Sequence, residues 1–221
     1  NHKPDFVWIK RTNGAGHHSL FDSVRGATEI IYSNLTNAEN TIASSLSTFN
    51  DKGFTVVSDN DVNGSGGMNY VAYGWKAGGG KSGGGGFFKD DVEYGSAAAA
   101  GITGLDGTGE MTTAKFLGCS IGAKQGFSII KYRGLGGGDV KVPHGLSQTP
   151  NMVIVKNIDS SVDWAITHSG LPGNRSLRFT TASTSTSGFL GLNKGGLAPS
   201  YFTINYSDTN LKYVNASNEN Y

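Results

Sequence analysis

PDFVWIK, at residues 4–10, has a close counterpart in PNMVIVK, at residues 150–156. Both stretches read proline, a polar residue, four apolar residues and lysine. A short apolar run bounded by turn-forming residues predicts a strand in the interior of a sheet. Because the pattern occurs once in each half of the chain, it indicates a repeated β-unit.

Four more pairs of segments follow in the same order in both halves. They are residues 20–23 and 164–168, 29–34 and 177–182, 53–57 and 201–205, and 69–70 and 220–221. The spacing between partners stays nearly constant, so we interpret the chain as two copies of one unit. The first copy continues past Tyr70 as an alternating strand that the second copy lacks. The second copy begins with residues 127–146, for which the first has no counterpart, and we therefore expect the chain to be a window of a longer polypeptide.

The composition favours short strands and tight turns. Glycine accounts for 34 of the 221 residues, against a usual share of about 7%, whereas there are only 5 prolines. Asn-Gly and Asp-Gly pairs, which tolerate positive φ, separate the apolar runs. We predict an all-β fold of β-sandwich modules of jelly-roll type, with one helical turn at residues 37–40. The predicted strands cover residues 5–10, 19–24, 28–33, 53–58, 70–75, 127–132, 139–143, 151–156, 162–168, 176–181, 200–206 and 211–214.

Three parts are expected along the chain. Residues 1–76 form the C-terminal part of a first module, residues 77–126 a Gly/Ala-rich connector, and residues 127–221 a second module without its last strand. The connector has two interpretations: a flexible link between modules, or a segment that packs along a neighbouring subunit. In the second interpretation Phe87 and Phe88 are the anchors, since two adjacent exposed phenylalanines are otherwise unfavourable.

Charge and cysteine content exclude several classes of protein. The formal net charge is only +1, which argues against a nucleic-acid groove or a basic membrane-binding surface, because both need clustered lysine and arginine. No apolar run approaches the roughly 18 residues of a spanning helix. Cys119 is the single cysteine, so no internal disulfide forms, and a small buried residue is expected there.

The chain lacks the patterns of a catalytic or cofactor site. GGGKS at residues 78–82 resembles part of a phosphate-binding loop, but Trp75 stands where the first glycine of that loop is required. The histidines have no metal-ligand spacing, and His144 reads as a turn histidine with satisfied hydrogen bonds. The acidic pairs Asp59/Asp61 and Asp90-Asp91 lie in turn-rich loops, where they are either solvated or weak calcium ligands. We predict no enzyme activity, no cofactor and no resident metal site.

Three tryptophans are candidates for a binding surface. Trp8 and Trp164 lie in predicted strands, where the alternatives are a place in the sandwich core and a place on a glycan-stacking surface. Trp75 ends a strand beside the glycine-rich segment and is predicted, with Phe87 and Phe88, to contact a partner.

The quoted stretches resemble a known kind of protein. PDFVWIK, LFDSVRGA (20–27), YSNLTNAE (32–39), STFNDKGFT (47–55) and YVAYGWKAGG (70–79) are together similar to a tandem Gly-rich β-domain of virion proteins from marine tailed phages. GFSIIKY (126–132), PHGL (143–146) and PNMVIVKN (150–157) resemble the opening of the same domain. Gly74 departs from the pattern, since related copies often carry cysteine there.

The resemblance implies a concanavalin-like jelly roll and a place on the virion surface. It implies a structural protein of a tail fibre or other appendage with a role in host attachment, and no catalytic residues. A capsid-decorating or head-fibre protein and a carbohydrate-binding module are the alternatives. The implied partners are other virion proteins, further copies of the chain in a homo-oligomer, for which fibres suggest a trimer, and a host-surface glycan.

Overall fold

The computed structural model describes residues 2–105, 109–172, 175–180, 192–204 and 211–221. Within these ranges the chain forms short strands, two four-residue α-helices and one 3-10 turn, so the all-β prediction is confirmed. The strands are β1 (Phe6–Arg11), β2 (His18–Asp22), β3 (Gly26–Tyr32), β4 (Asn40–Thr41), β5 (Leu46–Asn50), β6 (Gly53–Val56), β7 (Tyr70–Trp75), β8 (Phe87–Lys89), β9 (Val92–Tyr94), β10 (Phe116–Gly122), β11 (Phe127–Tyr132), β12 (Val140–Pro143), β13 (Met152–Val155), β14 (Ala165–His168), β15 (Leu192–Leu197) and β16 (Tyr201–Ile204). The helices are α1 (Asn60–Asn63) and α2 (Leu211–Val214), and η1 spans Thr113–Lys115.

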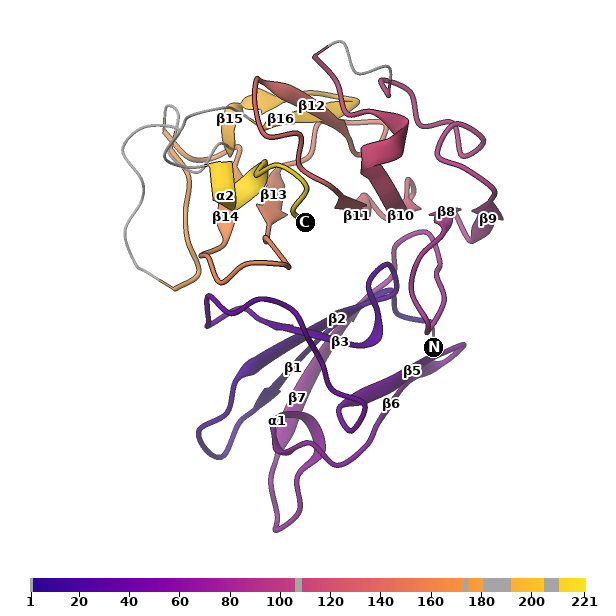
Figure 1. Cartoon of the computed structure of the whole chain (residues 1–221). Coiled ribbons are helices and arrows are strands. Elements are labelled where there is room, and N and C mark those ends of the chain that lie inside the picture. Colours follow the sequence, from indigo (N-terminus) through magenta and orange to yellow (C-terminus); the bar gives the residue numbers. More distant parts are fainter. Residues whose placement is uncertain (1, 106–108, 173–174, 181–191, 205–210) are drawn as a thin grey trace.

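The N-terminal module, residues 2–76, is a small β-sandwich. Its main sheet has the order β4-β3-β2-β1-β7 with antiparallel neighbours, and the β5–β6 hairpin covers one face. Alternation along β1 sends Val7 and Ile9 to that face, where they meet Phe21, Leu46 and Phe49 in a buried core. Figure 1 shows this module in indigo and purple, below the rest of the chain.

The C-terminal module, residues 127–221, shares a larger core with the segment that precedes it. Its strands form the sheets β12-β16-β15 and β13-β14, while β11 joins the mixed sheet β11-β10-β8-β9. These sheets enclose one buried cluster that includes Phe116, Val142, Val155, Leu192 and Ile204. Figure 1 shows them together, from magenta to yellow.

The expected connector, residues 77–126, contains ordered β-structure. It holds β8, β9 and β10, and β10 pairs with β11 on one side and with β8 on the other. Phe116, Cys119 and Ile121 of β10 belong to the C-terminal core. The predicted burial of Cys119 is confirmed, and burial raises the pKa of its thiol to about 11. The apolar side chains of β10 explain why this segment is ordered. Their burial offsets the entropy cost of fixing a Gly-rich chain.

Three local predictions are wrong. The strand predicted at residues 176–181 is reduced, within the described residues 175–180, to an isolated bridge between Leu177 and Ile166. Residues 211–214, predicted as a strand, form α2, and the helical turn expected at residues 37–40 is absent. A turn forms instead at α1, where the Asp59 carboxylate accepts a hydrogen bond from the Asp61 amide at 3.0 Å. Asp59 is as good an N-cap residue as Asn37, and burial of Val62 stabilises the turn that follows it.

Equivalent contacts confirm that the two modules are related. The Tyr70 hydroxyl accepts from the Gly64 amide at 2.9 Å and donates to the Asn60 carbonyl at 2.6 Å, which ties β7 to α1. The Tyr221 hydroxyl makes the same pair of bonds around α2. It accepts from the Ala216 amide at 2.8 Å and donates to the Lys212 carbonyl at 3.3 Å. The hairpins β1–β2 and β13–β14 also correspond, as the sequence repeat predicts.

The modules meet through a third buried cluster, called here the module interface. Leu20 and Ile31 of the N-terminal sheet pack against Ile158, Trp164 and Ile166. These side chains lie on the face of β2 and β3 that points away from the N-terminal core. The main sheet is therefore covered on both faces, by its own hairpin and by the second module.

A glycine-rich strap, residues 77–79, joins the modules beside this interface. The buried Asp5 carboxylate accepts from the amides of Ala77 at 2.8 Å and Gly79 at 3.1 Å. Between them, the Gly78 amide donates to the Ser120 hydroxyl of β10 at 3.0 Å. Alternate amides of the strap thus bond to the N-terminal module and to β10, whose side chains belong to the C-terminal core, and the backbone of Gly78 lies directly against β10.

Lys156 is buried at the edge of the module interface. Its ammonium donates to the carbonyls of Thr36 at 3.2 Å and Asn157 at 2.6 Å, so one bond reaches the N-terminal module. Burial lowers the pKa of Lys156 to about 8, although the carboxylate of Asp163 favours the charged form. The charged side chain thus has a lower pKa in the folded chain than in the unfolded one.

Raising the pH is expected to stabilise wild type relative to a Lys156→Met variant. The pKa is about 8 when folded and 10.5 when unfolded, so between these values the unfolded chain binds more protons, and stability rises with pH. The expected gain is about 3 kcal/mol, because one pKa unit corresponds to about 1.4 kcal/mol. Urea unfolding of wild type and the Lys156→Met variant between pH 8 and pH 10.5 measures this gain. The contributions of the other titrating groups cancel when the two proteins are compared. Curves of unfolding free energy against pH that run parallel would contradict the prediction.

Candidate interaction surface

An exposed aromatic patch lies where β7 borders the second module. It consists of Phe6, Tyr73, Trp75 and Phe127. Tyr73 and Trp75 are 53% and 39% exposed, and their ring centroids are 6.2 Å apart. Trp75 packs edge-on against Phe6 at 5.4 Å and stacks on Phe127 at 6.5 Å.

Strand register places these rings together. Phe6 lies opposite Trp75 in the β1–β7 ladder, and alternation puts Tyr73 and Trp75 on one face of β7. Phe127 opens β11, so the patch joins rings from both modules. β7 is also the last strand of its sheet among the described residues. The patch therefore combines exposed aromatic area with an open strand edge, the two features of a surface that binds a protein partner.

The predicted partner contacts lie in different surroundings. Trp75 is partly exposed in the aromatic patch, and its contact with a partner stays a prediction. Phe87 is half-buried and stacks on Phe116 at 6.3 Å, and Phe88 is buried. Neither phenylalanine is free to anchor a neighbouring subunit as proposed. The reason is that β8 pairs with β10, which draws both side chains into the chain's own sheet.

The glycan-stacking assignment of Trp164 is corrected in a similar way, whereas that of Trp8 stays a prediction. Trp164 is 3% exposed in the module interface, and its indole N–H donates to the carbonyls of Tyr32 at 3.2 Å and Leu35 at 3.1 Å. Trp8 packs against the same cluster and is half-buried. Stacking on a sugar needs a ring face open to solvent, and the Trp164 ring has none. Both residues hold the modules together.

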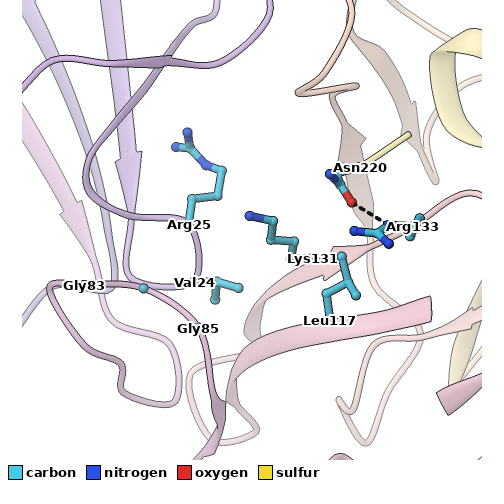
Figure 2. A pocket seen from close by; sticks show the side chains of 9 residues that line it. Val24, Arg25, Gly83, Gly85, Leu117, Lys131, Arg133 and Asn220 are labelled. Atoms are coloured by element: carbon cyan, nitrogen blue, oxygen red, sulfur yellow. Dashed lines mark hydrogen bonds between the residues drawn. The ribbon is translucent and has the colours of Figure 1, made fainter. Parts of the chain in front are cut away.

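The structure also brings together a basic pocket that sequence reasoning missed. The pocket has a volume of about 380 Å³ and lies between the modules. Its lining residues are Val24, Arg25, Gly83, Gly84, Gly85, Leu117, Lys131, Arg133 and Asn220. Three of them carry positive charge, and none of the described lining residues is acidic. Figure 2 shows Lys131 extending toward the side of the pocket where Arg25 lies, with Arg133 beside Asn220.

The three cations differ in how far they are neutralised. Arg25 is buried and forms ion pairs with Asp22 and Glu39. Burial alone would lower the pKa of Arg25, but the two carboxylates outweigh it and raise that pKa. Arg133 donates to the Asn220 side chain at 3.1 Å, a neutral partner. Lys131 and Arg133 are two residues apart, so they project from the same side of the chain and concentrate positive charge in the pocket.

The remaining candidate residues have structural partners. His144 is buried in its turn, where its Nδ1 accepts from the Leu146 amide at 3.1 Å and its Nε2 lies 3.0 Å from the Ala198 carbonyl. The satisfied-histidine prediction is therefore confirmed. Asp90 accepts from the Ala123 amide at 2.9 Å, and Asp91 pairs with Lys76.

No metal cluster or membrane helix is found in the described part of the chain. Within it, no three histidine, cysteine, aspartate or glutamate side chains group as ligands of one ion. Both α-helices there span four residues, and none of the described helices has the length and apolarity needed to cross a bilayer.

Comparison with known proteins identifies a repeated domain. The family described as "Domain of unknown function (DUF7483)" matches residues 1–123 and again residues 96–221. The two matches together span the chain. They agree with the repeat in the sequence and with the equivalent bonds that the Tyr70 and Tyr221 hydroxyls make around α1 and α2. No curated protein matches the chain, and no solved structure does either. The likeness to concanavalin-type jelly rolls thus stays a prediction.

Proposed function

The chain belongs to the family described as "Domain of unknown function (DUF7483)", and from this premise we propose that it is a structural, non-enzymatic component of a tailed-phage particle. We place it on the virion surface, in a tail fibre or another appendage with a role in host attachment. The resemblance of its repeated segments to virion proteins supports the phage assignment. The observation that carries the structural role is the aromatic patch at the junction of two fused β-modules.

The aromatic patch suits contact with other virion proteins or with further copies of the chain. Aromatic residues are enriched at protein interfaces because they bury large area at low entropic cost. The module interface and the strap fix the two modules relative to each other. The rings of the patch, which come from both modules, are therefore held in a fixed arrangement. We propose that such contacts build a homo-oligomer, with a trimer as the expected state.

Cryo-electron microscopy of the purified particle tests this assignment. Density for the chain in a fibre or tail appendage is the expected result. Density on the capsid shell would favour the alternative of a decorating or head-fibre protein, and absence of the chain from purified virions would end the proposal. In solution, a Tyr73→Ser/Trp75→Ser double variant is expected to associate less than wild type in sedimentation velocity. Val92→Ser, at another exposed apolar position, serves as the control.

A carbohydrate-binding role is the second candidate, and the basic pocket favours it. A pocket with two incompletely neutralised cations and few apolar residues suits an acidic sugar better than a neutral one, because carboxylates form charge-assisted hydrogen bonds with lysine and arginine. Residues 83–85, which are all glycine, form part of the pocket wall. Because glycine has no side chain, a ligand can approach the backbone closely there.

Substitution in the basic pocket is expected to weaken binding of acidic oligosaccharides. Lys131→Ala and Arg133→Ala should each lower affinity for galacturonate oligomers roughly tenfold, because each removes a charged hydrogen-bond donor. Isothermal titration calorimetry at low and high salt measures the change, with neutral galactose oligomers as the ligand control. Lys124→Ala, at an exposed lysine outside the pocket, is the protein control. Failure of wild type to bind any acidic oligosaccharide would remove this candidate.

A further inference from the structure

The basic pocket between the modules has two walls of different character. One wall, called here the β11 wall, contains Lys131 and Arg133. The other, called here the glycine wall, consists of residues 24–25 and of the glycines at 83–85. Figure 2 shows the two groups on opposite sides of the pocket. A ligand that fills the pocket therefore contacts both walls, and the charge of each wall decides which ligand fits.

The β11 wall carries positive charge that can bind an anion. Lys131 and Arg133 alternate with Tyr132, which lies in the C-terminal core, so both cationic side chains project away from that core. The Lys131 ammonium has no bonding partner among the described residues, and Figure 2 shows its side chain extending into the pocket. Arg133 uses its Nε–H on the Asn220 side chain. The Asp159 carboxylate nearby accepts from the Asn220 amide at 2.9 Å and from the Asn220 side chain at 3.0 Å.

The glycine wall has the opposite electrostatic character. Arg25 is buried and pairs with both Asp22 and Glu39. One positive and two negative charges give this group a net charge of −1. Charges inside a protein are screened by salt much less than exposed ones. A carboxylate placed against the glycine wall is therefore repelled, whereas one placed against the β11 wall is attracted.

The surface of the glycine wall is neutral backbone. A Cβ atom added at Gly83 or at Gly85 would have no atom within 4 Å, so both residues border open space. The Gly83 amide donates to no backbone carbonyl among the described residues. Exposed backbone amides and carbonyls form hydrogen bonds with hydroxyl groups, and the absence of side chains allows close approach. This wall thus suits the hydroxyls of an uncharged sugar.

We propose that the basic pocket binds a glycan at a point where a uronic acid is joined to a neutral sugar. The uronic acid carboxylate bonds to Lys131 and Arg133, and the neutral sugar lies against the glycines at 83–85. The pocket volume of about 380 Å³ falls within the range of about 300–1,000 Å³ that is usual for small-molecule sites. This inference rests on the carbohydrate-binding candidate proposed above and adds the order of charged and neutral sugars that the pocket selects.

A matched set of three disaccharides tests the proposal. Cellobiose, its mono-uronic acid and its diuronic acid share one linkage and differ only in the number of carboxylates. In isothermal titration calorimetry with the full chain, the mono-uronic acid is expected to bind roughly tenfold more tightly than cellobiose, because charge-assisted hydrogen bonds form. It is expected to bind roughly fivefold more tightly than the diuronic acid, whose second carboxylate is repelled by the glycine wall. The latter difference should shrink as salt is added.

A Gly83→Leu variant tests the contact with the glycine wall. The added Cβ meets no atom within 4 Å and the backbone φ is not positive, so the variant is expected to fold. Its side chain takes the place of the neutral sugar and should weaken binding of the mono-uronic acid roughly tenfold. Gly95→Leu is the matched control, because Gly95 has the same open surroundings but lies outside the pocket. Circular dichroism melting verifies that both variants fold.

The outcomes separate this inference from the candidate on which it rests. If neither acid binds more tightly than cellobiose, the basic pocket is not a site for acidic sugars, and both fail. If the acids bind but the diuronic acid binds as tightly as the mono-uronic acid or more tightly, the inference alone is overturned. Wild-type affinity of the Gly83→Leu variant for the mono-uronic acid would also overturn the inference alone.

Discussion

A Trp164→Ala variant is expected to lose about 3–5 kcal/mol of its free energy of unfolding, the usual cost of removing a fully buried indole. Trp164 is central to the module interface, where it packs beside Ile158 and Ile166 and leaves 3% of its surface exposed. The substitution also removes the donor for the carbonyls of Tyr32 and Leu35. Both losses fall on contacts between the modules.

Urea unfolding followed by circular dichroism measures this loss. Because the affected contacts join two cores, we expect the variant to unfold in two separable transitions, whereas wild type unfolds cooperatively. Trp75→Ala is the matched control, since it removes the same kind of side chain at a position in the aromatic patch that is 39% exposed. It is expected to cost about 1 kcal/mol, as substitutions at partly exposed sites do. Equal losses in the two variants would contradict the role of Trp164.

A Gly78→Ala variant is expected to lose at least about 3 kcal/mol, at or beyond the upper end of ordinary overpacking. A Cβ atom at residue 78 would lie 2.1 Å from the carbonyl oxygen and 2.5 Å from the amide nitrogen of Ile121. Both are backbone atoms of β10, which is held by strands on either side. The strap would have to move away and give up its bonds to Asp5 and Ser120.

Gly83→Ala is the matched control for Gly78. It makes the same change in the same glycine-rich segment, and no atom lies within 4 Å of the added Cβ. Its backbone does not have the positive φ that disfavours alanine, so we expect a change within about 0.5 kcal/mol. Thermal unfolding of the two variants beside wild type measures the difference. If Gly78→Ala is as stable as Gly83→Ala, the strap is not held against β10 in solution.

The strands that sequence reasoning predicted well are those with a clear local signal. β1, β7, β11 and β13 have apolar runs or strict alternation, and all four appear close to the predicted bounds. β10 was missed because glycines interrupt its apolar positions, and β8 because its three residues are too few to show a period of two. Residues 211–214 were assigned to the wrong class because four residues are too few to distinguish the helical period from the strand period. Bonds between the Tyr221 hydroxyl and the backbone of Lys212 and Ala216 favour the helical turn, and no local pattern contains them.

The candidate sites depend on contacts that no local pattern contains. Trp8 lies in β1, Trp75 ends β7 and Trp164 directly precedes β14, yet Trp75 is exposed and the other two pack in the module interface. The basic pocket draws Arg25 and Arg133 from opposite modules. Glycine content predicted turns correctly, but it did not distinguish a flexible link from the strap, whose order comes from the Asp5 carboxylate.

The amino-acid sequence by itself determined the β-class of the chain, its two-copy organisation and the places of its main strands, because alternation, turn residues and repetition act over a few neighbouring positions. Only the tertiary structure decided which strand faces meet, which tryptophans are buried and where positive charge collects. These depend on how two separate sheets pack against each other, and the free energy of that packing is shared among residues more than a hundred positions apart in the chain.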